Sequence, residues 1–116
     1  MIMFSNKYRL RETKKIAQVF KTGKHIHGKY IFIKYTVSKE TSPRVAISVS
    51  TKLFKKAVDR NRIKRLIREA IKPHLTTLPN LDILIIAKKE IDENISLTEL
   101  KKDTVNIFNK LISPKY

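Results

Sequence analysis

The amino-acid sequence predicts a single α+β domain, an α-β sandwich in which helices pack on a mixed sheet. Its length of 116 residues fits one domain with one modest core. Segments with the two-residue apolar period of strands alternate with segments that have the 3.6-residue period of helices. Their order is α-β-β-α-β-α, and a further short strand near residues 50–53 is an open alternative. No repeat, low-complexity tract or linker divides the chain, so residues 1–116 are expected to form one unit.

The amino-terminal part predicts an arm followed by a short helix. Residues 1–12 are basic and lack a clear period, which indicates an extended arm. In the segment TKKIAQVFKTGK, Ile16, Val19 and Phe20 share one side of a helix. Gly23 then stands where a helix usually stops.

Two strands are expected next. The segment KYIFIKYTV, residues 29–37, is aromatic and β-branched, as is typical of strands. Its side chains alternate between the two faces of the sheet, with Ile31, Ile33 and Tyr35 on one face and Tyr30, Phe32 and Lys34 on the other. After a turn at ETSP, the segment RVAISVS, residues 44–50, alternates in the same way. The two segments are expected to pair as an antiparallel hairpin.

The remaining elements are a helix, a buried strand and a second helix. The helix over residues 56–72 ends at Pro73, because the residue before a proline disfavours the helical region. The continuous apolar run LDILIIAKK, residues 81–89, predicts a buried strand. A helix that connects two strands in this way allows them to lie parallel in one sheet. Ser96 and Glu99 have the spacing of a capping box at the start of the last helix.

The segment KKAVDRNRIKRLIREAIK, residues 55–72, carries eight basic side chains in eighteen positions. At 100° per residue its apolar and basic side chains separate into two arcs that do not interleave. The apolar arc contains Ile63, Leu66, Ile67, Ala70 and Ile71. The other arc is almost wholly cationic, with Arg60 at the border, whereas solvated helix faces usually mix both signs of charge. Arginine binds phosphate with two parallel hydrogen bonds, so this arc predicts nucleic-acid binding.

The overall composition agrees with an anionic partner. The chain has 26 Lys and Arg against 10 Asp and Glu, a formal net charge of +16, which favours nucleic acid first and an anionic membrane surface second. The absence of cysteine excludes disulfides and thiolate metal sites. The longest apolar run, ILIIA, has only the length of a strand, so we expect a cytoplasmic protein without a membrane partner. With two glycines in the whole chain, no glycine-rich phosphate loop is expected. We also expect no small-molecule substrate.

RNA fits the pattern better than DNA. The helix-turn-helix or dimer pattern of a typical DNA groove reader is missing, and a sheet-backed helix with one broad basic face suits the phosphates and shape of folded RNA. The histidines, His25, His27 and His74, have no helical ligand spacing and no evident carboxylate partner. We therefore expect no bound metal and no catalysis by protein side chains. A structural ribosomal protein and a self-sufficient ribonuclease that uses two histidines are the alternatives.

The segment RVAISVSTK…KKAVDRNRIKRLIREA, residues 44–70, closely resembles the bacterial ribonuclease P protein subunit. Within it, RNRIKRLIRE is similar to the Arg-Asn-Arg motif of that family, and the likeness extends to NKYRLRETKKIAQVFKTGK, KYIFIKYT and LDILIIAKK. The resemblance implies a subunit that binds a catalytic RNA and the 5′ leader of precursor tRNA, and that assists endonucleolytic removal of the leader. It also implies that the RNA carries out the hydrolysis with Mg²⁺, and that the strand-helix-strand crossover is left-handed.

The resemblance implies two sets of functional residues. The set implied to bind the catalytic RNA consists of Lys52, Lys56, Arg60, Asn61, Arg62, Lys64, Arg65 and Arg68. The set implied to line a leader-binding cleft between the first helix and the sheet consists of Ile16, Phe20, Ile33 and Tyr35. Aromatic side chains on a sheet face can hold single-stranded bases by stacking, and they can equally be core residues. Of the strand residues, we place Tyr35 in the cleft and Phe32 in the core.

Overall fold

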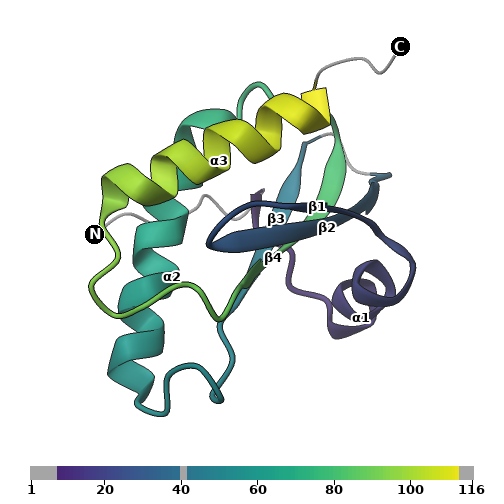
Figure 1. Cartoon of the computed structure of the whole chain (residues 1–116). Coiled ribbons are helices and arrows are strands. Elements are labelled where there is room, and N and C mark those ends of the chain that lie inside the picture. The colour runs from purple at the N-terminus through teal and green to yellow at the C-terminus, as the bar shows by residue number, and fades with distance from the viewer. Residues whose placement is uncertain (1–7, 40–41, 113–116) are drawn as a thin grey trace.

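The computed structural model describes residues 8–39 and 42–112. Four strands form one mixed sheet in the order β1-β2-β4-β3 (Figure 1). The strands are β1 (Lys24–His27), β2 (Ile31–Val37), β3 (Arg44–Ser48) and β4 (Leu81–Ala87). β2 pairs antiparallel with both β1 and β4, whereas β3 pairs parallel with β4. This is the mixed sheet and α+β class that the sequence predicts.

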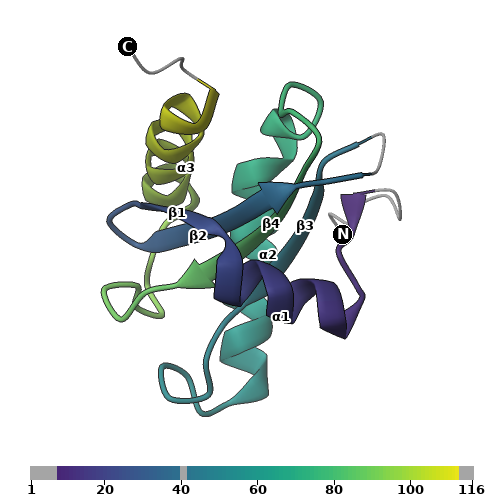
Figure 2. The ribbon, with the colours of Figure 1, turned by 90° about the vertical axis from the view of Figure 1, so that its right-hand side faces the viewer.

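Helices cover both faces of the sheet. On one face lie α2 (Ala57–Ile71), which continues into the 3₁₀ turn η2 (Lys72–His74), and α3 (Leu97–Ile112). On the other face lies α1 (Thr13–Thr22) alone, as Figure 2 shows. Because α1 is short, it covers only part of its face, and this position matters for the site described below.

The main core lies between the sheet and the helices α2 and α3. The sheet contributes Ile31, Ile33, Val45, Ile83 and Ile85, and the helices contribute Ile63, Ile67, Ile71, Leu100, Ile107 and Phe108. Ile63 and Ile67 have 0% exposed surface, which confirms the predicted apolar arc of the basic helix. A smaller cluster of Leu10, Val19 and Leu84 holds α1 on the opposite face.

Two predictions about the sheet are wrong. The segments that form β2 and β3 do not make a hairpin, because β4 lies between them. β4 is apolar on both faces, and its first five residues are all buried. A central position in the sheet covers both faces and both edges of such a strand. Residues 51–53 form a turn, so the open alternative of a further strand there is wrong. The additional short strand of the sheet is β1, which lies earlier in the chain.

Local signals at the helix ends agree with the prediction. The Ser96 Oγ accepts a hydrogen bond from the backbone N–H of Glu99 at 3.2 Å, which is one half of the predicted capping box. α2 ends at Ile71, and Pro73 follows within η2. Gly23 follows α1 directly, and a Cβ atom at this position would lie 2.5 Å from the carbonyl oxygen of Val19 and 3.0 Å from the backbone nitrogen of Tyr35. This close approach to β2 requires glycine.

The predicted amino-terminal arm is described from residue 8 onward, and residues 1–7 lie outside the described part. Arg9 forms a parallel bridge with Val45 of the edge strand β3. The backbone N–H of Leu10 also donates to the carbonyl oxygen of Val45 at 3.0 Å. The arm is therefore pinned to the open edge of β3. None of the described helices has the length and apolar character needed to cross a membrane.

Candidate nucleic-acid interface

All eight residues predicted to bind RNA lie on α2 or in the turn before it. Asn61, Arg62 and Arg65 are exposed along the helix, as are Lys52 and Lys56 before it. The other three, Arg60, Lys64 and Arg68, are half-buried. The structure thus brings the predicted set together on one continuous basic face.

Two arginines of this face are held by backbone carbonyl groups. Arg60 Nη1 donates to the carbonyl oxygens of Phe54 and Lys55, each at 2.8 Å, which fixes the start of α2 to the preceding turn. Arg62 Nη1 donates to the carbonyl oxygen of Glu93 in the loop before α3. These bonds use only part of each guanidinium, which has five N–H donors, and they orient both groups.

Arg68 lies at the far end of the basic face, where α2 meets the amino-terminal arm. Together with Arg9 and Arg11 it lines a cavity of about 340 Å³, whose walls also include Ile16 and Ala46. Burial lowers the pKa of Arg68, and the charges of Arg9 and Arg65 lower it further. The group stays cationic, but the crowding of positive charge makes an anion at this place favourable. Arg9 and Arg11 were not predicted as site residues, although the run RLR within a basic arm was a signal for them.

The four residues predicted to line the leader cleft do not all lie together: Ile16 and Phe20 share α1, but the placement of Ile33 and Tyr35 beside them is wrong. Ile16 belongs to the cluster under α1, and Phe20 lies one helical turn further along α1. Ile33 has 0% exposed surface and Tyr35 packs on the main core, both on the opposite face of the sheet. Side chains of a strand alternate between faces, so the residues of β2 that face α1 are the other set.

That other set contains Phe32 and Lys34. Phe32 is half-buried rather than a core residue, and it lies opposite Ile86, a member of the α1-side cluster. Lys34 Nζ lies 4.0 Å from the centroid of the Phe20 ring and donates to the carbonyl oxygen of Phe20 at 2.8 Å. Phe20 is 52% exposed. Apolar rings and a cation therefore share the sheet face beside α1.

A comparison with known protein families identifies this arrangement. The family model Ribonuclease P matches residues 4–112. The chain belongs to the ribonuclease P protein family. Relatives described as ribonuclease P protein component include one from Bacillus velezensis, 38% identical over 88% of this chain and 87% of its own length. Another, from Azoarcus, is 30% identical over 93% of this chain and 89% of its own length.

Solved structures of ribonuclease P proteins share the fold. The protein from Staphylococcus aureus superposes with a TM-score of 0.78 at 27% identity, covering 90% of this chain and 95% of its own. The protein from Thermotoga maritima gives a TM-score of 0.77 at 26% identity, covering 91% of this chain and 98% of its own.

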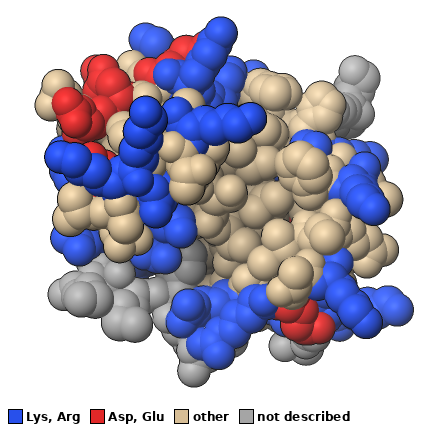
Figure 3. Space-filling view, turned by 90° about the horizontal axis from the view of Figure 1, so that it is seen from below, with Lys and Arg blue, Asp and Glu red and all other residues tan. Residues whose placement is uncertain are grey.

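The surface seen in this ribonuclease P family member has two charged rims. Figure 3 views the molecule from the side on which α1 and the start of α2 lie in Figure 1. An uncharged, hollowed surface runs between Lys and Arg side chains on both sides of it. A single strand can place its bases against such a surface and its phosphates against the rims.

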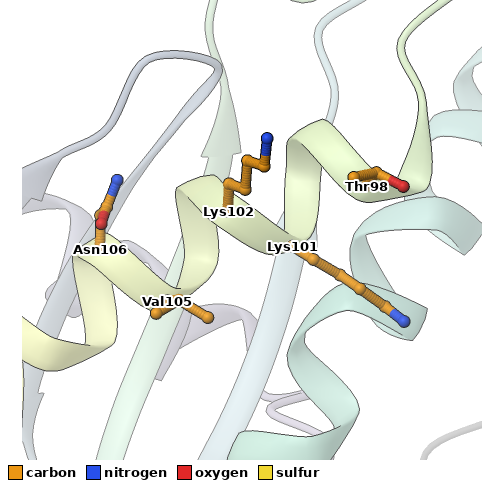
Figure 4. A pocket seen from close by; sticks show the side chains of 5 residues that line it. All are labelled: Thr98, Lys101, Lys102, Val105 and Asn106. Atoms are coloured by element: carbon orange, nitrogen blue, oxygen red, sulfur yellow. The ribbon is translucent and has the colours of Figure 1, made fainter.

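A second hollow lies away from this surface, along the outer side of α3. It measures about 480 Å³ and is lined by Thr98, Lys101, Lys102, Val105 and Asn106 (Figure 4). These five described residues all belong to α3, and none of them is an Asp, a Glu or a His. Among the described residues, no three His, Asp or Glu side chains gather in a way that could hold a metal ion.

Proposed function

We propose that this chain is the protein subunit of a ribonuclease P, which binds the catalytic RNA and the 5′ leader of precursor tRNA during removal of the leader. The observation that carries the proposal is a pair of surfaces, the arginine-rich face of α2 and an uncharged surface that lies between Lys and Arg side chains (Figure 3). The first surface suits the phosphates of a folded RNA, and the second suits an unpaired strand. Membership of the family supports the same assignment.

The basic face of α2 is the surface for the catalytic RNA. Exposed Arg62 and Arg65 can each bind a phosphate with two hydrogen bonds. Arg60 and Arg62 are already oriented by carbonyl groups of neighbouring loops, so binding costs less side-chain entropy than it does for a free arginine. Lys52 and Lys56 extend the same charge along the turn before the helix.

The surface between α1 and the sheet is the place for the leader. Phe20 presents an exposed ring, and Lys34 beside it supplies a cation within reach of a passing phosphate. Ile16 and Ala46 continue the apolar surface toward the cavity lined by Arg9, and so toward the basic rim. Ile33 and Tyr35 have no part in this assignment, since they face the main core.

The hydrolysis belongs to the RNA component, which requires Mg²⁺, and the protein contributes binding and orientation. The histidine arrangement supports this division. His74 packs on Phe108 with a ring distance of 5.0 Å, and burial lowers its pKa. His74 lies in η2 and packs on α3, whereas His25 and His27 lie on β1.

The test is cleavage of precursor tRNA by the catalytic RNA at low Mg²⁺, with and without the chain. We expect the chain to raise kcat/KM under these conditions and to show no cleavage without the RNA. Cleavage by the chain alone would identify a self-sufficient ribonuclease. No effect on the RNA-catalysed reaction would indicate a structural ribosomal protein.

The leader assignment has its own test in the reconstituted complex. Phe20→Ala should lower affinity for precursor tRNA by about 1–3 kcal/mol, the value of one stacked base, and leave affinity for mature tRNA unchanged. Val105→Ala is the matched control, because Val105 is 41% exposed but lies on the outer side of α3. Equal losses for precursor and mature tRNA would contradict the assignment.

A further inference from the structure

Three rings form a row across β1 and β2. The rings of His27 and Phe32 stack, with centroids 4.9 Å apart and planes at 21°. The rings of His25 and His27 meet edge to face, with centroids 5.1 Å apart. Both histidines are exposed. Stacked and edge-to-face geometries are the favourable arrangements for aromatic pairs, so the row is an ordered group.

The row lies on the same face of the sheet as Phe20. His27 is the partner of Phe32 across the β1–β2 pair, and His25 is the partner of Lys34. Lys34 in turn contacts the Phe20 ring. Directly opposite residues in an antiparallel pair point to the same face. The exposed aromatic surface therefore continues from α1 across β2 to the outer strand β1.

We propose that His27 and Phe32 form a base-stacking site for an unpaired nucleotide of an RNA strand, at the β1 edge of the sheet and beyond Phe20 and Lys34. The inference rests on the proposed function and extends the RNA surface to β1. A strand that passes Phe20 meets His27 and Phe32 next along the sheet. The ligand is a single-stranded nucleotide because a paired base has no open face to stack.

The backbone around this site is held rigidly by α3. The Asp103 carboxylate accepts backbone N–H bonds from Lys29 at 2.7 Å, from Tyr30 at 2.8 Å and from Ile31 at 3.1 Å. Lys29 and Tyr30 belong to the turn that joins β1 to β2, and Ile31 is the first residue of β2. Gly28 completes the contact, because a Cβ atom there would lie 2.5 Å from Asp103 Oδ1 and 2.6 Å from Ile107 Cδ1.

The same turn sets the register of β1. A slip of one residue would move His25 and His27 to the opposite face. The Gly28 N–H donates to Ile31 O at 2.8 Å, and Lys88 Nζ donates to Gly28 O at 2.9 Å. With Asp103, these bonds leave one register for the hairpin. The two rings are therefore preorganised, which lowers the entropic cost of binding a flexible strand.

The charges around the site suit a nucleotide. Partial desolvation beside the Phe32 ring lowers the pKa of His27, although most of the side chain is exposed, and the charges of His25, Lys88 and Lys34 lower it further. Each of these effects favours the neutral imidazole, which stacks as an aromatic ring. The two lysines remain as cations for the phosphate that accompanies the stacked base.

The experiment is an abasic scan of the leader in the reconstituted complex. Precursor tRNAs that each lack one leader base are titrated against the parent complex, His27→Ala and His27→Phe. We expect one leader position at which base removal weakens binding to the parent by about fivefold or more, which is the low end for one stacked base. At that position, removal of the base should leave the affinity of the His27→Ala complex nearly unchanged. The His27→Phe complex should lose as much affinity as the parent does. Comparing both changes in this way isolates the pairwise contact.

Two outcomes overturn different statements. If base removal costs the parent and His27→Ala the same at every leader position, the β1 site is wrong while leader binding stands. If base removal costs the parent nothing anywhere, and the parent binds precursor and mature tRNA equally, the proposed leader binding itself fails. Because His27 is exposed, we expect these variants to fold like the parent. A melting temperature within about 2 °C of the parent value would verify this for each variant.

Discussion

Replacement of Asp103 by alanine tests whether α3 holds the β1–β2 turn. The side chain is 5% exposed and accepts three backbone hydrogen bonds from Lys29, Tyr30 and Ile31. Lys29 is exposed, so water can replace the acceptor there. Ile31 is 0% exposed and Tyr30 half-buried, so their N–H groups would lose a partner. At about 1–3 kcal/mol for each of these two groups, Asp103→Ala should lower the free energy of unfolding by roughly 2–6 kcal/mol.

The measurement is urea or thermal unfolding followed by circular dichroism. For a domain of this size, the loss corresponds to a melting temperature lower by about 10 °C or more. Asp92→Ala is the matched control, because the exposed Asp92 accepts one local bond, from the Asn94 N–H at 2.9 Å. The control should cost no more than about 1 kcal/mol.

An equal melting temperature for Asp103→Ala and Asp92→Ala would refute the reasoning, since it would mean that the three bonds are replaced by water at no cost. A second result links the turn to the RNA surface. Asp103→Asn keeps the size of the side chain but offers one carbonyl oxygen and a donor in place of two acceptors. It should destabilise by less than Asp103→Ala and still weaken the effect of His27 in the abasic scan, because the register of β1 is less firmly held.

Three further predictions concern the basic face, the core and the pH dependence of folding. Affinity for the catalytic RNA should fall by roughly 10³ or more between 50 and 200 mM salt, and Arg65→Ala should reduce the slope by about one without changing the melting temperature; a flat salt dependence would contradict phosphate binding. Ile67→Ala should cost about 2–5 kcal/mol through the cavity it leaves, and a variant that melts like the parent would show that α2 is oriented wrongly. Burial lowers the pKa of His74 below its ordinary value of 6.5, so the unfolded chain binds more protons than the folded chain, and stability should fall as the pH decreases below about 6.5. His74→Gln should flatten this dependence when unfolding is measured at a series of pH values. An unchanged slope would contradict the prediction.

The basic helix could be predicted from the sequence because the pattern that defines it lies within one continuous segment. The apolar and basic residues of α2 separate by angle alone, and Ile63 and Ile67 are buried as that angle requires. The pairing of strands could not be predicted in the same way. β2 and β3 are neighbours in sequence, but the position of β4 between them depends on burying an apolar strand on both faces, which is a property of the whole sheet.

The strand β1 could not be predicted because it has no local signal in the sequence. The segment KHIH has little β-branched character and no apolar alternation, so propensity does not predict β1. Its pairing with β2 depends on Asp103, which is more than seventy residues away in the chain. Contacts at such a separation leave no local pattern in the sequence.

The leader surface was assigned to the wrong face of β2 because alternation divides a strand into two sets without saying which set meets the core. Both sets of this strand contain rings, so aromatic character did not decide between them. Lys34 was the available signal. An unpaired lysine head in the middle of a strand is costly on a face closed by two helices, whereas α1 leaves room for its Nζ beside the Phe20 carbonyl. The set that contains Lys34 therefore faces the partly open side. Phe32 lies with it on the surface that we propose for the RNA, whereas Ile33 and Tyr35 belong to the core. Tyr35→Ala should accordingly lower the melting temperature while the ratio of precursor to mature tRNA affinity stays that of the parent, and a selective loss of precursor binding in a variant of parental stability would return Tyr35 to the leader surface.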